Sequence, residues 1–193
     1  MRSDIVLAGV GGQGVLSVAA ILAEAARREG LTVKQAEVHG MAQRGGAVQA
    51  TLRISSGEIA SELVPRGAAT MILGMEPVEA LRYLDFLAPD GTLLTAAEPV
   101  RNVPDYPPLG AVHEQIRGLG GLIVEADRLA REAGSPRAAN VVMVGAASTR
   151  LDLPREVLEA CVRDGFASKG ERIVEVNLRA FRAGRAAVSP APS

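Results

Sequence analysis

A glycine-rich stretch near the amino terminus, Gly9-Val10-Gly11-Gly12-Gln13-Gly14, has the residue types of a nucleotide-binding loop. It fits the pattern G-x-G-x-x-G, in which glycines permit positive φ angles and let a ligand approach the backbone. A helix that begins directly after such a loop points unpaired N–H groups at it and favours a phosphate or a carboxylate. The stretch therefore predicts a ligand-binding loop, with a tight packing turn as the alternative.

A dinucleotide-binding loop needs an acidic residue about 20 residues beyond the glycines to hold a ribose, and Glu37 meets this requirement approximately. The chain then continues into more glycines, where a dinucleotide-binding fold would begin its next helix. Leu16 and Ser17 stand where a P-loop needs Lys-Ser/Thr, so nucleotide hydrolysis is not expected. A self-contained NAD(P)- or flavin-binding oxidoreductase stays open as an alternative.

A second glycine loop follows Glu37, and it carries an arginine beside two glycines. The guanidinium of Arg44 could form paired hydrogen bonds to a phosphate or carboxylate, and the glycines leave backbone N–H groups free to assist. An exposed arginine in an ordinary turn is the alternative. His39 could act as a ligand or move a proton, although a plain hydrogen-bonding histidine suits the position equally well.

The two loops need elements that bring them together. Residues 4–10 form a short apolar run typical of a buried strand, and apolar residues recur at helical spacing from Val15 until Gly30 ends the helix. Residues 31–38 alternate and predict a second strand, which completes a right-handed, Rossmann-like βαβ unit. Both loops then follow strands at one edge of the sheet, where open α/β sheets bind ligands.

The rest of the chain predicts a mixed sheet and a helical last third. Alternating runs at residues 48–54 and 59–64 predict a β-hairpin insertion, residues 99–109 a proline-rich loop, and Asp127 the start of a helix. We expect an α/β fold, a three-layer αβα arrangement with a mixed, mostly parallel sheet. Residues 1–184 should form a single domain and residues 185–193 a disordered tail.

Composition excludes several function classes. The 21 Lys and Arg residues balance 22 Asp and Glu residues, which gives no electrostatic support for nucleic-acid binding. The lone Cys161 cannot form an internal disulfide, a four-cysteine zinc site or an iron–sulfur cluster. No apolar run approaches the ~20 residues of a membrane span, and no signal peptide is visible, so we expect no membrane association and a cytoplasmic location.

The segments "GVGGQGVL" and "EVHGMAQRGG" resemble those of a known family, the gamma-type component of 2-oxoacid:ferredoxin oxidoreductases, and in particular its indolepyruvate type. "GxGGQG" is common to the wider family, whereas "VHGMAQRGG" is more particular to the indolepyruvate type. The segments "ANVVMVGAAS" and "KGERIVEVNLRAFRAG" fit as well, so the resemblance extends roughly from Asp4 to Gly184.

The resemblance implies a subunit of an enzyme that oxidatively decarboxylates a 2-oxoacid, here an arylpyruvate, to an acyl-CoA and CO2, with two electrons passing to ferredoxin. Thiamine diphosphate, Mg and the iron–sulfur clusters would belong to a larger partner subunit, coenzyme A would be a co-substrate, and this chain alone would be inactive. A binding module of the same fold without an enzymatic role is a further alternative.

The family loops then correspond to two sets of residues that would face a cofactor or the partner. The first set is Gly9, Gly11, Gly12, Gln13 and Gly14, and the second is His39, Gly40, Gln43, Arg44, Gly45 and Gly46. Within these sets the resemblance makes Arg44 the best candidate to bind a phosphate of coenzyme A or of thiamine diphosphate. It assigns no catalytic acid or base and no metal ligand to this chain.

Overall fold

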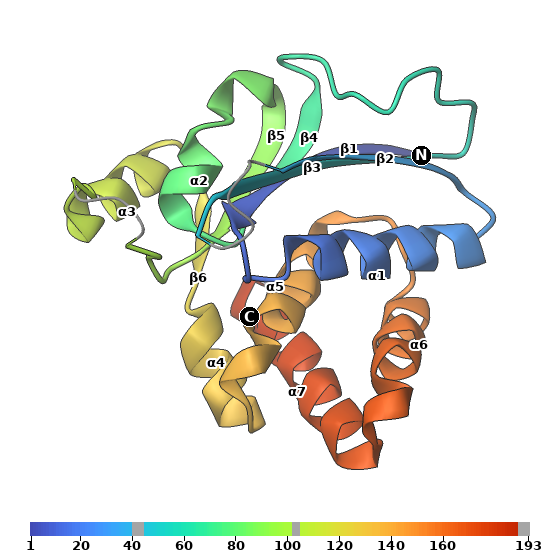
Figure 1. Ribbon diagram of the computed structural model, residues 1–193. Helices are drawn as coiled ribbons and strands as arrows, with labels where there is room; N and C mark the ends of the chain where they lie inside the picture. The colour runs from blue at the N-terminus through green and yellow to red at the C-terminus, as the bar shows by residue number, and fades with distance from the viewer. Residues whose placement is uncertain (40–44, 102–104, 189–193) are drawn as a thin grey trace, which may run out of the picture.

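The fold is built on one twisted sheet with helices on both faces (Figure 1). The computed structural model describes residues 1–39, 45–101 and 105–188. Within these residues the sheet has six strands in the order β2-β3-β1-β4-β5-β6. Their bounds are β1 Arg2–Val10, β2 Thr32–His39, β3 Ala47–Ser55, β4 Ala69–Gly74, β5 Leu87–Ala96 and β6 Leu122–Val124.

The sheet is mixed and mostly parallel, as predicted. β1, β4, β5 and β6 pair in parallel, whereas β3 is antiparallel to both of its neighbours, β1 and β2. β3 therefore lies between the two strands of the predicted βαβ unit. The helix α1 (Val15–Arg28) still connects β1 to β2, and it ends next to Gly30, which has a φ of 72°.

Helices cover the two faces of the sheet unequally (Figure 1). One face carries α1 together with α4 (Ala126–Ala133), α5 (Ala139–Ala147), α6 (Arg155–Phe166) and α7 (Glu171–Val188). The other face carries the short α2 (Pro77–Leu81) and α3 (Leu109–Gly118). This arrangement confirms the three-layer αβα fold. No helix among the described residues is long and apolar enough to span a membrane.

Side chains that alternate along the strands pack into two separate hydrophobic cores, one on each face of the sheet. In β1, Ile5 and Leu7 pack into the larger cluster with α1 and α5, whereas Val6 points the other way into a smaller cluster with Ile116 of α3. Successive side chains of a strand point to opposite faces, so a strand buried on both faces is apolar at nearly every position. The apolar run from Ile5 to Val10 has this cause.

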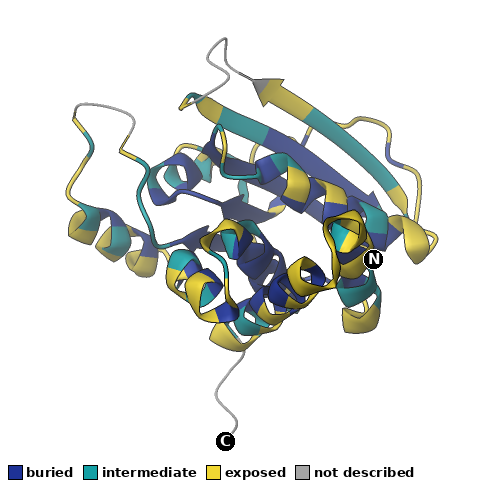
Figure 2. Cartoon of the chain, turned by 60° about the horizontal axis from the view of Figure 1, so that its bottom comes forward, coloured by how far each residue is buried: buried dark blue, intermediate teal, exposed yellow. Residues whose placement is uncertain are grey.

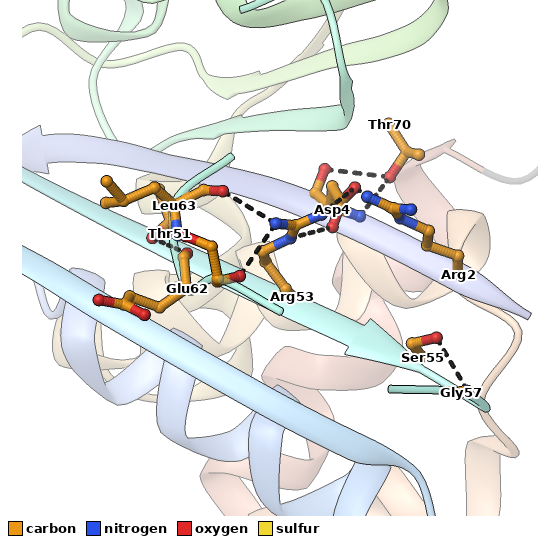
Figure 3. A network of polar contacts seen from close by, with 10 residues as sticks. Arg2, Asp4, Thr51, Arg53, Ser55, Gly57, Glu62, Leu63 and Thr70 are labelled. Atoms are coloured by element: carbon orange, nitrogen blue, oxygen red, sulfur yellow. Dashed lines mark hydrogen bonds and ion pairs between the residues drawn. The ribbon is translucent and has the colours of Figure 1, made fainter. Parts of the chain in front are cut away.

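The prediction that residues 59–64 form the second strand of a hairpin is wrong. β3 instead forms its hairpin with β2, and residues 59–64 run along the sheet as an irregular segment. Arg53 holds this segment: its Nη1 donates to the carbonyl oxygens of Ser61 and Leu63, both at 2.9 Å (Figure 3). These carbonyls therefore bond to a side chain rather than to a neighbouring strand.

A buried ion pair fixes Arg53 in turn. Its Nε lies 2.7 Å from Oδ1 of Asp4, and both side chains are almost fully buried. Arg2 donates to the second carboxylate oxygen of Asp4 from the solvent side, at 2.9 Å (Figure 3). A buried charge is tolerated only when it is paired and hydrogen-bonded, and this network satisfies both groups.

Two helix boundaries differ from the sequence-based expectation. Asp127 does not cap α4; its backbone N–H donates instead to Oε1 of Glu98, at 3.0 Å. A side chain distant in sequence thus takes the capping role, which a local pattern cannot show. At the other end, α7 continues through Val188, so the first part of the expected tail at 185–193 is helical. Residues 189–193 lie outside the described residues.

Candidate functional site

The first glycine loop joins β1 to α1, and its glycines serve two different purposes. Gly12 and Gly14 have positive φ angles, 102° and 81°. A Cβ on Gly14 would lie 2.7 Å from Nδ2 of Asn140, whereas a Cβ on Gly12 would meet nothing within 4 Å. Gly14 therefore lets the start of α1 approach the start of α5, while Gly12 leaves its backbone open toward space that a ligand can enter.

Gly9 and Gln13 tie the loop to the neighbouring strand. The backbone N–H of Val10 donates to Oε1 of Gln13 at 2.8 Å, and Nε2 of Gln13 donates to the carbonyl of Met75 at 2.8 Å. A Cβ on Gly9 would lie 3.0 Å from Oε1 of Gln13. The Gln13 amide thus bridges the ends of β1 and β4, and Gly9 leaves room for that bridge.

The second glycine loop meets the first, as the sequence predicted. β1 and β2 end at the same edge of the sheet, and the N–H of Gly11 donates to the carbonyl of Gly46 at 2.9 Å. Gly45 has a positive φ of 74°, and His39 is the last residue of β2. Gly40, Gln43 and Arg44, which the sequence also assigned to this surface, lie outside the described residues.

A cleft of about 220 Å³ opens beside the first loop, at the carboxyl ends of β1, β4 and β5. It lies where α1, α4 and α5 begin, so the positive ends of these helix dipoles point toward it. Its lining combines loop, strand-end and helix-start residues, among them Gly12, Gln13, Met75, Glu98, Asp127, Arg137 and Asn140.

Two polar side chains in the cleft have unused hydrogen-bonding capacity. Oε2 of Glu98 and Oδ1 of Asn140 are inaccessible to solvent and have no hydrogen-bond partner among the described residues. Burial raises the pKa of Glu98, although the N–H groups at the start of α4 oppose that shift. Arg137 adds a cation on the rim. Both oxygens are closed off from solvent, so what the cleft offers a ligand is the positive charge of Arg137 and the N–H groups at the helix starts.

The sequence analysis did not identify three of the polar residues that line the cleft, because each lies far along the chain from the glycine motifs. These residues are Glu98, Arg137 and Asn140. The usable signal was topological: in an open α/β sheet, the segments after strands and the starts of helices gather at one edge. Ser135-Pro136 marks such a start, because the Ser135 hydroxyl accepts from the N–H of Arg137 and Pro136 occupies the first position of the turn.

The position of Glu37 argues against a dinucleotide site of the usual kind. In that fold the strand bearing the ribose-binding acid lies directly beside the first strand. Here β3 separates β2 from β1, and the Glu37 carboxylate accepts from Nε2 of Gln35 at 2.7 Å. Glu37 thus has the sequence spacing of a ribose-binding acid, but its strand does not lie beside the first strand as that role requires.

Cys161 lies on α6 in the large core, where burial raises its pKa. A buried thiol with a raised pKa is a poor nucleophile and a poor metal ligand. In the parts of the chain that the structure describes, no group of three His, Cys, Asp or Glu side chains could hold a metal ion.

These features belong to a known protein class. The family model "Pyruvate ferredoxin/flavodoxin oxidoreductase" matches residues 4–187, so the chain is a member of that family. The indolepyruvate oxidoreductase subunit IorB of Archaeoglobus fulgidus is 38% identical, in an alignment covering 100% of this chain and 99% of that protein.

Solved structures share the fold. A keto/oxoacid ferredoxin oxidoreductase gamma subunit from Geobacter sulfurreducens matches with a TM-score of 0.68 and 26% identity, over 94% of this chain and 95% of that one. The 2-oxoglutarate:ferredoxin oxidoreductase of Magnetococcus marinus, solved with 2-oxoglutarate, coenzyme A and succinyl-CoA, matches with a TM-score of 0.76 and 24% identity. The match covers 96% of this chain but only 30% of that longer chain.

Proposed function

We propose that this chain is the small subunit of a 2-oxoacid:ferredoxin oxidoreductase that acts on indolepyruvate or related arylpyruvates. The supporting observation is the similarity to the indolepyruvate oxidoreductase subunit over essentially the full length of both proteins. A larger partner subunit would hold thiamine diphosphate with its Mg ion and the iron–sulfur clusters, and ferredoxin would accept the electrons. Decarboxylation and transfer to coenzyme A would then take place in the assembled enzyme.

The residues present fit this division of labour. A single buried cysteine cannot ligate an iron–sulfur cluster, which needs several thiolates. The cleft of about 220 Å³ is smaller than the roughly 300–1,000 Å³ of pockets that enclose a ligand. A cleft of this size, rimmed by Arg137 and helix starts, suits one end of an anionic ligand such as coenzyme A, the remainder being held elsewhere.

Reconstitution tests the proposal. The isolated chain should not reduce a viologen dye with any 2-oxoacid, whereas the complex with the large subunit encoded in the same genome should do so with coenzyme A present. Indolepyruvate and phenylpyruvate should be preferred over pyruvate and 2-oxoglutarate. Acceptor reduction by the isolated chain, or saturable micromolar NAD(P)H binding to it, would instead favour a self-contained oxidoreductase.

The proposed phosphate contact of Arg44 has its own test in the complex. Arg44→Ala should raise the apparent KM for coenzyme A or weaken thiamine diphosphate retention, at a cost of about 1.5–3 kcal/mol for a lost charged hydrogen bond. Arg66→Ala serves as the control, because Arg66 is exposed and its ion pair with the exposed Asp85 is long, at 3.7 Å. Unchanged kinetics and normal assembly of the Arg44 variant would assign Arg44 to an ordinary turn.

A further inference from the structure

The segment between β5 and α3 begins at the wall of the cleft. The backbone of Ala97 is fixed on both sides, because its N–H donates to the carbonyl of Val124 at 2.8 Å and its own carbonyl accepts from Nε2 of His113 at 2.9 Å. Pro99 and Val100 follow, and both line the cleft. The cleft wall therefore starts at a fixed point of the backbone.

The other end of the segment is fixed by a hydrogen bond between side chains. The hydroxyl of Tyr106 donates to Oε1 of Glu76, and Glu76 directly follows Met75, which also lines the cleft. No residue of 97–101 or 105–108 is fully buried (Figure 2). Packing alone therefore does not hold the segment, and the Tyr106 hydroxyl is a specific anchor for it.

Prolines restrict the backbone around Tyr106. A residue that precedes proline is confined largely to the extended region, and Tyr106 precedes Pro107. Pro107 and Pro108 have a fixed φ, and Pro108 leads directly into α3, whose Ile116 is fully buried in the smaller core. The hydroxyl therefore loses little conformational entropy when it binds Glu76.

Glu76 depends on this bond in turn. It is only 1% exposed, and its Oε2 accepts from the N–H of Glu79 at the start of α2, at 2.8 Å. Without the Tyr106 hydroxyl, Oε1 becomes a buried carboxylate oxygen that lacks this donor, which is costly unless water replaces it. Water that enters between Glu76 and residue 106 separates the segment from α2.

We propose that Tyr106 is a positioning residue of the cleft, because its bond to Glu76 fixes the segment that forms one wall. The wall residues are Pro99 and Val100. Both lie between the anchors at Ala97 and Tyr106, so loss of one anchor loosens the wall. The inference rests on the proposed function for the ligand, which is one end of coenzyme A. The anchor itself does not depend on that ligand.

Removal of one hydroxyl tests the inference. In the full chain, Tyr106→Phe should accelerate trypsin cleavage after the exposed Arg101 by about threefold or more, because a loosened segment enters the protease more often. In the complex with the large subunit, the same variant should raise the apparent KM for coenzyme A by about threefold or more and leave kcat unchanged.

Tyr83→Phe is the matched control. Tyr83 follows α2 and is half-buried like Tyr106, but its hydroxyl makes no hydrogen bond to any described residue. This variant should match the wild type in both measurements. Mass spectrometry of the fragments identifies the cut, and thermal unfolding of each variant confirms that the fold is intact.

The two measurements separate the proposals. Faster cleavage and a raised KM in Tyr106→Phe, with Tyr83→Phe unchanged, support the positioning role. Cleavage at the wild-type rate overturns the anchor, and faster cleavage with an unchanged KM overturns its effect on the cleft; both leave the proposed function in place. An equal fall in kcat and kcat/KM also overturns the inference. A wild-type complex without coenzyme A-dependent activity overturns the proposed function and, with it, the ligand named here.

Discussion

At the scale of single residues, the structure gives several members of the glycine motif a role in packing and hydrogen bonding. The sequence correctly located a loop between a strand and a helix, and it correctly placed the second loop at the same edge of the sheet. The structure joins the two loops by a hydrogen bond from Gly11 to Gly46. It could not show that Gly14 accommodates Asn140 or that the Gln13 amide is bonded on both sides, because both partners lie far along the chain. Of these loop residues, Gly12 has the open backbone that a ligand could approach.

Replacing Gln13 should therefore reduce stability even without a ligand. Gln13→Ala leaves the N–H of Val10 and the carbonyl of Met75 without their side-chain partner. Unpaired groups of this kind cost about 1–3 kcal/mol of the free energy of unfolding, less where the cleft admits water. Urea denaturation of the isolated chain measures the loss. Gln115→Ala on the exposed side of α3 is the matched control and should leave stability unchanged. An unchanged midpoint for Gln13→Ala would contradict the structural role.

At the scale of elements, local patterns predicted most helices and strands but not all of their partners. The amphipathic spacing identified α6 and α7, and the apolar run identified β4. The alternation at residues 59–64 failed as a strand prediction because the side chain of Arg53, not a neighbouring strand, takes the carbonyl groups of Ser61 and Leu63. Register and capping depend on contacts distant in sequence, such as the one between Glu98 and α4.

The contact between α5 and α7 depends on two glycines. A Cβ on Gly145 would lie 1.9 Å from the carbonyl oxygen of Phe181, and a Cβ on Gly184 would lie 1.9 Å from that of Val142. Both partner atoms belong to the backbone, so the helices must separate to admit a methyl group. Gly145→Ala and Gly184→Ala should each destabilise the protein by about 3 kcal/mol or more.

A third glycine supplies the control for this contact. A Cβ on Gly165 of α6 would meet nothing within 4 Å. Gly165→Ala should therefore stabilise the chain by about 0.5–1 kcal/mol, since alanine loses less backbone entropy in a helix. Chemical denaturation of the three variants compares them directly. Equal effects at Gly145 and Gly165 would show that the close approach of α5 and α7 is not needed.

An ion pair joins α6 to α7 and makes stability depend on pH. Glu159 accepts from Nη2 of Arg182 at 2.7 Å and from Nε of Arg155 at 2.8 Å, and these bonds, that of Arg182 first, lower the pKa of Glu159 from 4.5 to about 2. A lowered carboxyl pKa contributes stability that is complete above pH 4.5 and is lost as the pH falls toward 2.

Glu159→Gln should remove this pH-dependent contribution to the free energy of unfolding. Because Arg182 is half exposed, solvent screening limits the loss at pH 7 to about 1 kcal/mol. The difference in unfolding free energy between wild type and variant should shrink as the pH falls from 4.5 to 2. A difference that stays constant with pH would contradict the assignment to the Glu159 carboxylate.

At the scale of the whole molecule, the sheet is protected very unequally. β1 lies in the middle of the sheet and is buried on both faces, whereas β2 is an edge strand in the described sheet, covered by α1 on one face and by residues 59–64 on part of the other. An edge strand with an exposed apolar face is an aggregation risk unless something covers it.

Hydrogen exchange should report this inequality. In the isolated chain, amides of β1 should exchange only through global unfolding, whereas peptides from β2 and residues 59–64 should exchange faster through local opening. Mass spectrometry of peptides from the two strands measures the difference. Exchange in β2 that is as slow as in β1 would contradict the unequal protection, because β2 has no fully buried residue among those described.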